Sequence, residues 1–263
     1  MNILEEIVLH KKSEVRSRKS EVSISDLEKS DLFTRQTFSL KQSLLDKAKT
    51  GIIAEFKRKS PSKGVINANA DVMEVTIAYT EHGASGVSVL TDEIFFRGCS
   101  KDLIKARINN IPLLRKDFII DEYQIVEAKS IGADVILLIA ACLTQAEVKR
   151  LAKFAKELDL EVLLELHAEK ELDHICDETE LIGINNRNLK TFEVDIERSL
   201  KMSQKIPAGK IKIAESGINS IEDILLFMEH DFHGFLIGEN FMKQPEPTIA
   251  FAEFINQLKA KVS

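Results

Sequence analysis

The sequence predicts an α/β protein, a (β/α)8 TIM barrel preceded by an N-terminal helical extension. From Gly51 onward, short apolar runs of β-rich composition recur about every 26 residues. Segments with helical periodicity fill most of the gaps between these runs. Eight such strand–helix units in a chain of 263 residues match a barrel of this kind, which typically needs about 250 residues.

The competing architecture is a doubly wound open sheet. It usually has fewer strands, and a GxGxxG turn would favour it, but no such turn follows any of the runs. The expected strands are 52–56, 86–91, 111–118, 134–140, 161–166, 181–186, 211–216 and 234–238. The clearest expected helices are 71–84, 144–160 and 220–231. Barrel active sites lie at the carboxyl ends of the strands, so polar residues at those ends are the informative ones.

The first part of the chain differs from the rest. ILEEIVLHKKSEVRSRK and SLKQSLLDKAKT have helical spacing, and SISDLEKSDLF between them offers Ser and Asp as helix caps. We therefore expect residues 1–48 to form a helical extension that packs on a barrel of residues 49–263, within one structural domain. It can serve as a lid on the barrel top or as a plug under the bottom. We expect its charged residues to be solvated, namely Lys11, Lys12, Arg16 and Arg18.

Composition excludes several classes of protein. The net charge of −6 and the pI of about 5.7 argue against a dedicated nucleic-acid binder. The longest apolar run, 135–143, is far shorter than the about 20 residues of a membrane-spanning helix. The acidic N-terminus argues against a signal peptide, and three widely spaced cysteines suit free thiols, so we expect a cytoplasmic protein. We expect no metal, no cofactor and a monomer, with a weak homodimer as the alternative.

Charged residues inside the expected strands point to a chemical site. Glu55 and Lys57 share a strand face with Ile53, so on a barrel strand both project into a poorly solvated lumen and need each other or a ligand. Lys116 shares a face with Leu114 and Phe118. Near apolar rings and a second lysine its pKa should be lowered, which would suit a proton donor, although a surface lysine fits this segment equally well.

Later strands add polar groups of the same kind. The fifth strand places Glu165 and His167 on one face, and the sixth places Asn185 and Arg187 on one face. The alternatives are a structural ion pair for Glu165 and a salt bridge at the barrel rim for Arg187. Glycines end the seventh and eighth strands, where barrels often hold a phosphate. Together these residues predict a phosphorylated anionic substrate and acid/base chemistry without a metal.

These motifs resemble the indole-3-glycerol-phosphate synthase family of tryptophan biosynthesis over nearly the whole chain. Glu55-x-Lys57-x-x-Ser60-Pro61-Ser62 is the most specific motif, and Leu114-Arg115-Lys116-Asp117-Phe118 is nearly as specific. Supporting matches are LLELH around Glu165, IGINNRNL around Asn185, AESGI at 214–218 and LIG at 236–238. Some relatives have Ser where this chain has Glu239. If the phosphate site is kept, we expect Glu239 to offer its N–H and point its side chain away.

The resemblance implies a barrel whose helical extension forms a lid, and a carboxy-lyase. The reaction converts 1-(2-carboxyphenylamino)-1-deoxyribulose 5-phosphate to indole glycerol phosphate, CO2 and water. By resemblance, Lys116 is the proton donor of ring closure, and Leu138 joins the apolar wall. The implied catalytic residues are Lys116, Glu165, Lys57, Glu55, Asn185 and Ser216. The implied substrate-binding residues are Ser60, Phe96, Phe118, Arg187, Gly217, Leu236, Gly238 and Glu239.

Two other functions stay open at this point. An isomerase acting on a phosphorylated aminoaldose, such as phosphoribosylanthranilate isomerase, would leave the Glu55/Lys57 pair and the N-terminal extension unexplained. A barrel that only binds phosphorylated ligands would be expected to lose its proton donors, whereas both lysines and Glu165 are present.

Overall fold

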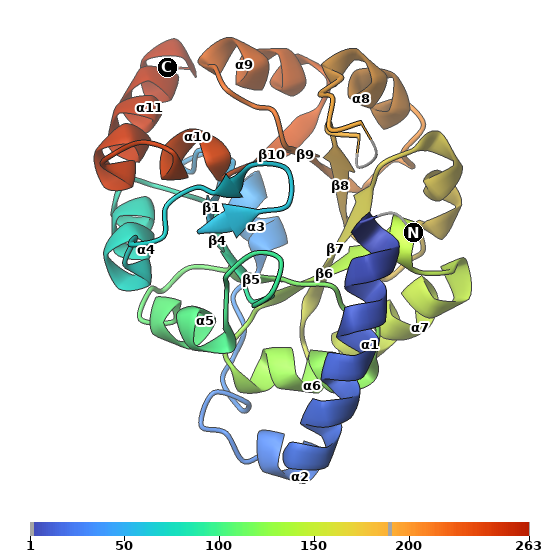
Figure 1. The fold of residues 1–263 in the computed structure, drawn as a ribbon. Helices are drawn as coiled ribbons and strands as arrows, with labels where there is room; N and C mark the ends of the chain where they lie inside the picture. Colours follow the sequence, from blue (N-terminus) through green and yellow to red (C-terminus); the bar gives the residue numbers. More distant parts are fainter. Residues whose placement is uncertain (1–2, 189–190, 263) are drawn as a thin grey trace.

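The computed structural model describes residues 3–188 and 191–262, and its centre is a closed barrel of eight parallel strands (Figure 1). Each barrel strand pairs with the next barrel strand in the chain, and the last pairs with the first. The predicted fold class is confirmed, and all eight expected runs form barrel strands. The barrel strands are β1 (Ile52–Phe56), β4 (Gly86–Leu90), β5 (Leu113–Lys116), β6 (Val135–Ile139), β7 (Glu161–Leu166), β8 (Leu181–Asn185), β9 (Ile211–Glu215) and β10 (Phe232–Ile237).

Helices surround the barrel and cover the outer faces of its strands (Figure 1). The three clearest expected helices begin at side-chain caps: Asp71 accepts backbone N–H groups, while Thr144 and Ser220 form capping boxes. The outer helices are α4 (Val72–Glu81), α5 (Ser100–Ala106), α6 (Glu122–Ser130), α7 (Gln145–Glu157), α8 (Ile196–Ser203), α9 (Ile221–Glu229), α10 (Glu239–Met242) and α11 (Pro247–Val262). The shorter elements are β2 (Lys59–Ser60), β3 (Gly64–Val65), η1 (Ala140–Cys142) and η2 (Glu169–His174). Among the described residues, no helix is long and apolar enough to cross a membrane.

Strand alternation produces two hydrophobic cores. Alternate side chains along each strand have the same parity, which means that they point to the same face. Those of one parity, such as Ile53, Leu163 and Ile213, fill the barrel interior. Their neighbours, such as Ile52 and Ala214, pack between the strands and the outer helices. A polar residue of the first parity near the carboxyl end of a strand therefore faces the barrel mouth, as the sequence pattern predicts.

The first helix, α1 (Ile3–Glu21), crosses the barrel face that carries the carboxyl ends of the strands (dark blue in Figure 1). Its Ile3, Leu4 and Ile7 line the cavity at this end. A short helix, α2 (Ile24–Leu27), follows, and its cap residue Ser23 accepts the N–H of Asp26. The first part of the extension therefore covers the barrel mouth.

The last helix of the extension, α3 (Leu40–Leu45), lies at the opposite end. Leu40 and Leu44 are buried in the interior core. The N–H of Leu40 donates to Glu161 at the start of β7, and the hydroxyl of Ser43 donates to the carbonyl of Ser85 before β4. The position expected of a lid is thus that of α1, which covers the mouth. The position expected of a plug is that of α3, which closes the bottom.

The expectation that the charges of α1 are solvated is wrong for Lys11 and Arg18. The Lys11 ammonium is fully buried and lies 2.8 Å from Glu14, 3.0 Å from Asp92 and 2.9 Å from Asp117. Arg18 pairs with Glu127 of α6 at 2.7 Å. The reason is that the mouth-covering position of α1 brings these cations against carboxylates that follow β4 and β5.

Candidate active site

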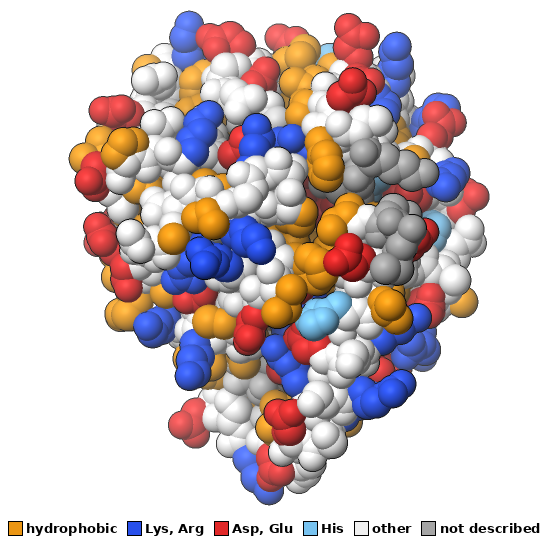
Figure 2. Space-filling model, viewed as in Figure 1, with side chains coloured by type: hydrophobic (Ala, Val, Ile, Leu, Met, Phe, Trp, Pro, Cys, Tyr) orange, Lys and Arg blue, Asp and Glu red, His pale blue; other side chains and the backbone are white. Residues whose placement is uncertain are grey.

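A cavity of about 600 Å³ opens at the carboxyl ends of the barrel strands. Side chains from β1, β5, β7, β8, β9 and β10 reach into it, together with the apolar face of α1. Figure 2 shows hydrophobic side chains gathered near the centre of this face, with charged side chains around them. Its size suits a small-molecule ligand.

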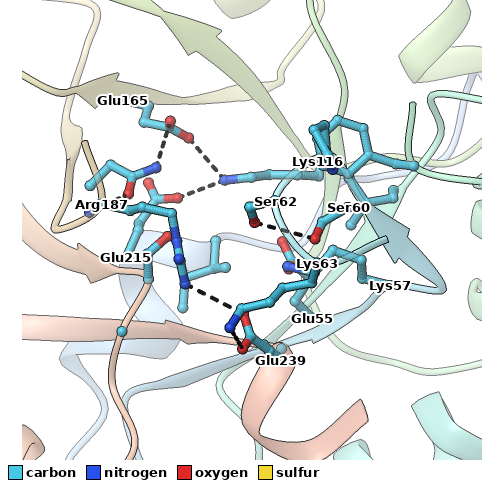
Figure 3. Close-up of a pocket in the computed structure, with 18 of the residues that line it drawn as sticks. Glu55, Lys57, Ser60, Ser62, Lys63, Lys116, Glu165, Arg187, Glu215 and Glu239 are labelled. Carbon is cyan, nitrogen blue, oxygen red and sulfur yellow. Dashed lines mark hydrogen bonds and ion pairs between the residues drawn. The ribbon is translucent and has the colours of Figure 1, made fainter. Parts of the chain in front are cut away.

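Lys116 stands at the centre of the cavity (Figure 3). Its Nζ lies 3.0 Å from Oε2 of Glu165 and 2.6 Å from Oε2 of Glu215. The side-chain amide of Asn185 donates to Oε1 of Glu165 at 3.0 Å. These residues lie at or next to the carboxyl ends of β5, β7, β8 and β9, so four strands bring one cation, two carboxylates and an amide together.

The expected lowering of the Lys116 pKa is wrong. Burial by itself lowers the pKa of a lysine, but here three glutamates outweigh it, first Glu165 and Glu215 and then Glu55. The pKa of Lys116 is therefore raised, and its amine recaptures a proton strongly after giving one up. The sequence pattern shows Phe118 beside Lys116, but the carboxylates come from strands far along the chain.

The two central carboxyl groups differ in protonation. Burial raises the pKa of Glu165, but the charge of Lys116 and the hydrogen bonds to Glu165 outweigh burial and hold this pKa well below its usual range. Burial, together with the charge of Glu165, outweighs Lys116 and raises the pKa of Glu215 to about 7. Near neutral pH the site therefore contains one firmly ionised carboxylate and one carboxyl group that can hold a proton.

Glu55 and Lys57 form an ion pair on the wall formed by β1 (Figure 3). The Glu55 side chain is only 4% exposed and that of Lys57 17%. Gly238 leaves room for this pair, because a Cβ at that position would lie 2.7 Å from Oε1 of Glu55. Similarly, a side chain in place of Gly183 would collide with the carboxylate of Glu215.

The loops after β8, β9 and β10 form a polar end of the cavity. Ser216 and Gly217 both have left-handed backbone conformations, with φ of 67° and 71°, which turns the chain sharply after β9. Ser60 faces this region from β2, and its hydroxyl lies 3.5 Å from that of Ser62. These groups and Gly238 line the same cavity.

The expectation that the Glu239 side chain points away from this end is wrong. Its carboxylate lies 3.4 Å from Arg187 and 3.5 Å from Lys63, and all three residues line the cavity (Figure 3). The salt bridge left open for Arg187 is thus present. Two cations attract the carboxylate more strongly than the backbone turn directs it outward.

An apolar wall faces Lys116. The rings of Phe96 and Phe118 lie 6.2 Å apart between centroids and are tilted by 40°. Leu236 and α1 extend this wall. The expected place for Leu138 is wrong, because this residue packs outward against the helices. Its neighbours Leu137 and Ile139 line the cavity instead, as the opposite strand parity requires.

All the catalytic and substrate-binding residues in the two sets implied by the resemblance line this one cavity, whereas Leu138 and His167 do not. The sequence reasoning missed three further contributions: the carboxylate of Glu215, the ammonium of Lys63 and the apolar face of α1. Strand alternation offers a signal for Glu215, because it lies two residues after Ile213 and shares the interior face. Local patterns offer no signal for Lys63, which reaches the site from the β2–β3 turn.

A family model described as indole-3-glycerol phosphate synthase matches residues 4–254 of this chain. The chain belongs to the indole-3-glycerol phosphate synthase family. An indole-3-glycerol phosphate synthase from Bacteroides thetaiotaomicron is 45% identical over 259 residues, covering 98% of this chain and 99% of that protein. One from Acinetobacter baylyi is 44% identical, covering 95% of this chain and 94% of that protein. The function is that of this family, a carboxy-lyase of tryptophan biosynthesis.

Solved structures with much lower sequence identity to this chain support the fold. The tryptophan synthase α-subunit of Pyrococcus furiosus matches with a TM-score of 0.60 at 14% identity, covering 81% of this chain and 98% of that chain. At this identity the likeness concerns the barrel fold alone.

Proposed function

We propose that this indole-3-glycerol phosphate synthase family member closes the indole ring of 1-(2-carboxyphenylamino)-1-deoxyribulose 5-phosphate in the cavity at the barrel mouth. The observation that carries the proposal is the position of Lys116, a largely but not fully buried cation between two carboxylates that faces an apolar wall. The wall of Phe96, Phe118 and Leu236 holds the aromatic ring. Arg187 and Lys57 neutralise the ring carboxylate before it leaves.

The phosphate is assigned to the polar end of the cavity. Ser60 and the backbone N–H groups of Gly217, Gly238 and Glu239 are placed to surround it, because glycine lets an anion approach the backbone closely. Lys63, which contacts Glu239, lies at the same end and adds positive charge.

Ring closure needs a proton at the former ketone oxygen. The ring carbon that carries the carboxylate attacks the ketone, and the developing alkoxide takes a proton from Nζ of Lys116. The carboxylate then leaves as CO2, and its electron pair restores the aromatic ring. Glu165 lies 3.0 Å from the same Nζ and is placed to return a proton to it.

Dehydration needs a base and an acid that exchange protons with each other. Glu55 and Lys57 are in contact, so Glu55 can take a proton from the methylene carbon next to the nitrogen while Lys57 protonates the departing hydroxyl. A proton passing from Glu55 to Lys57 then restores both groups. Asn185 and Ser216 are assigned to orienting the ribulose hydroxyls and the acid groups.

The proposed reaction is tested by incubating the purified protein with this substrate and following indole fluorescence. We expect the fluorescent indole glycerol phosphate to form, with release of one CO2 per turnover. A protein that binds the substrate but forms no indole product would overturn the proposal and favour a barrel that only binds phosphorylated ligands.

Chelation is expected to leave the activity unchanged. The carboxylates of the cavity are neutralised by lysines, and among residues 3–188 and 191–262 no group of three or more His, Cys, Asp or Glu is placed to hold a metal ion. The measurement is the turnover rate with and without EDTA, followed by metal analysis of the purified protein. Activity that is lost with EDTA and restored by a divalent cation would contradict this prediction.

We also propose that the extension, residues 1–48, consists of a lid and a plug on a barrel of residues 49–263. A variant that begins near Ser39 removes α1 and α2 but keeps α3. We expect it to fold and to have a KM raised by about tenfold, which corresponds to about 1.4 kcal/mol of lost substrate binding. The lid excludes water and supplies Ile3, Leu4 and Ile7 to the cavity wall.

A second deletion, beginning near Gly51, serves as the comparison because it also removes α3. It should lower the free energy of unfolding, since Leu40 and Leu44 would no longer fill the barrel bottom. If the first deletion keeps the wild-type KM, or fails to fold, the lid assignment is wrong.

A further inference from the structure

A second cavity of about 940 Å³ lies on the other side of α1, next to the site described above. It is enclosed by α1, by η1 after β6 and by η2 after β7. Titratable side chains line much of it, and the proposed reaction uses none of them. These residues are Glu5, Lys12, Cys142, His167, Lys170, Glu171 and His174.

His167 belongs to both regions. It follows β7 with the same parity as Glu165, its side chain is 8% exposed, and its Nε2 lies 2.8 Å from Oε1 of Glu165. Both of its ring nitrogens are buried and neither meets hydrogen-bond geometry with a described residue, so the contact of Nε2 with Glu165 is an ion-pair contact. The carboxylate of Glu171 lies 4.0 Å from Nδ1, a gap that one bridging water or a small rotation closes.

The proposed reaction takes up one proton in each turnover. The substrate carboxylate leaves as neutral CO2, and Lys116 supplies the proton that stays on the former ketone oxygen. In the dehydration step, Glu55 passes the proton that it takes up to Lys57, so these two residues end unchanged. One proton must therefore come from solvent to reload Lys116, while bound substrate and α1 cover the cavity in which it stands.

We propose that His167 passes this proton from the second cavity to Glu165, which hands it to Lys116. The inference rests on the proposed function. In the transfer, the imidazolium of His167 loses its Nε2 proton to the carboxylate of Glu165, and Glu165 gives a proton to the neutral amine 3.0 Å away. The neutral imidazole keeps its proton on Nδ1, so rotation of the ring must bring the free Nε2 to the second cavity, where it takes a new proton from water before it turns back to Glu165. All groups return to their starting state.

The charges around His167 support this role. Burial lowers the pKa of the imidazole, but the close contact and charge of Glu165, followed by the charges of Glu171 and Glu215, outweigh it and raise the pKa. His167 is therefore ready to hold a proton near neutral pH. Groups on the other elements around the cavity complete its surroundings, namely Glu5 and Lys12 on α1, Cys142 on η1, and Lys170 and His174 on η2.

The test separates proton transfer from positioning. His167→Gln keeps an N–H donor for Glu165 but cannot carry a proton, so we expect kcat to fall about tenfold or more with KM unchanged. The wild-type kcat should fall as pH rises through the raised pKa of His167, and the variant should lack this limb. Added imidazole should restore part of the kcat of His167→Ala. His174→Gln changes a histidine of the same cavity that does not contact Glu165, and it should retain the wild-type kcat.

His167→Gln with the wild-type kcat at every pH would overturn the relay, as would an equal loss in His174→Gln. If the His167 variants fail to fold, Ala141→Trp decides the question, because Ala141 is exposed, lines the second cavity and does not touch Glu165. An unchanged kcat in that variant would also overturn the relay. A wild-type protein that forms no indole product would instead refute the proposed function.

Discussion

Replacing Lys116 by alanine is expected to lower kcat by about 100-fold or more and to leave the fold largely intact. Lys116 is the half-buried cation that can protonate the alkoxide formed in ring closure, and general acid catalysis contributes about 10²–10⁴-fold. The proposed phosphate end of the cavity lies apart from Lys116, so binding of inorganic phosphate should persist. The measurements are kcat by indole fluorescence, circular dichroism, and phosphate binding by calorimetry.

The loss of this cation also changes the remaining carboxyl groups. Without Lys116, Glu165 and Glu215 face each other in a buried site, and one of them should take up a proton. Lys101→Ala, which removes an exposed lysine on α5, is the matched control and should keep the wild-type kcat. Near-normal kcat in a folded Lys116→Ala protein would remove Lys116 from its assigned role.

Replacing Lys11 by methionine is expected to lower the free energy of unfolding by about 3 kcal/mol. The variant keeps α1 over the barrel but leaves Asp92 and Asp117 buried without their shared cation, and removal of one partner of a buried ion pair costs about 3–5 kcal/mol. The lower end of that range applies because Asp117 also accepts a hydrogen bond from Thr91. Urea unfolding monitored by circular dichroism measures the change.

The neighbouring Lys12→Met is the matched control, since Lys12 is exposed on the same helix and should change stability by less than about 0.5 kcal/mol. The effect should also depend on pH. Although burial opposes it, Lys11 leads the charges that hold the pKa of Asp117 below its usual value, so its stabilisation is present above about pH 4 and is lost as pH falls. An equal loss in both variants, or a loss that does not shrink in acid, would contradict the prediction.

Lys11→Met and the deletion that begins near Ser39 have different expected effects on the protein. The deletion removes α1, so Asp92 and Asp117 become accessible to water, whereas Lys11→Met keeps them covered. We therefore expect the deletion to act mainly on KM and the substitution mainly on stability. The comparison separates the two roles of α1.

The local pattern of the sequence by itself determined the barrel strands and which of their side chains face the interior. The spacing of the apolar runs predicts all eight strands, and strand alternation places Glu55, Lys116 and Glu165 in the interior. These predictions succeed because side-chain direction along a strand depends only on position within that strand. Leu138 fails to line the cavity for the same reason, because its side chain has the opposite direction along β6.

Other properties were decided only by the tertiary structure. Lys11 meets Asp117, Lys116 meets Glu215, and these partners lie on elements far apart in the chain. The raised pKa of Lys116 and the burial of Lys11 follow from such contacts, so a local pattern misjudges both. The positions of α1 over the barrel mouth and α3 at the barrel bottom have the same origin. Amphipathic spacing shows that a helix buries one face, but only the closed barrel decides which of its two ends each helix covers.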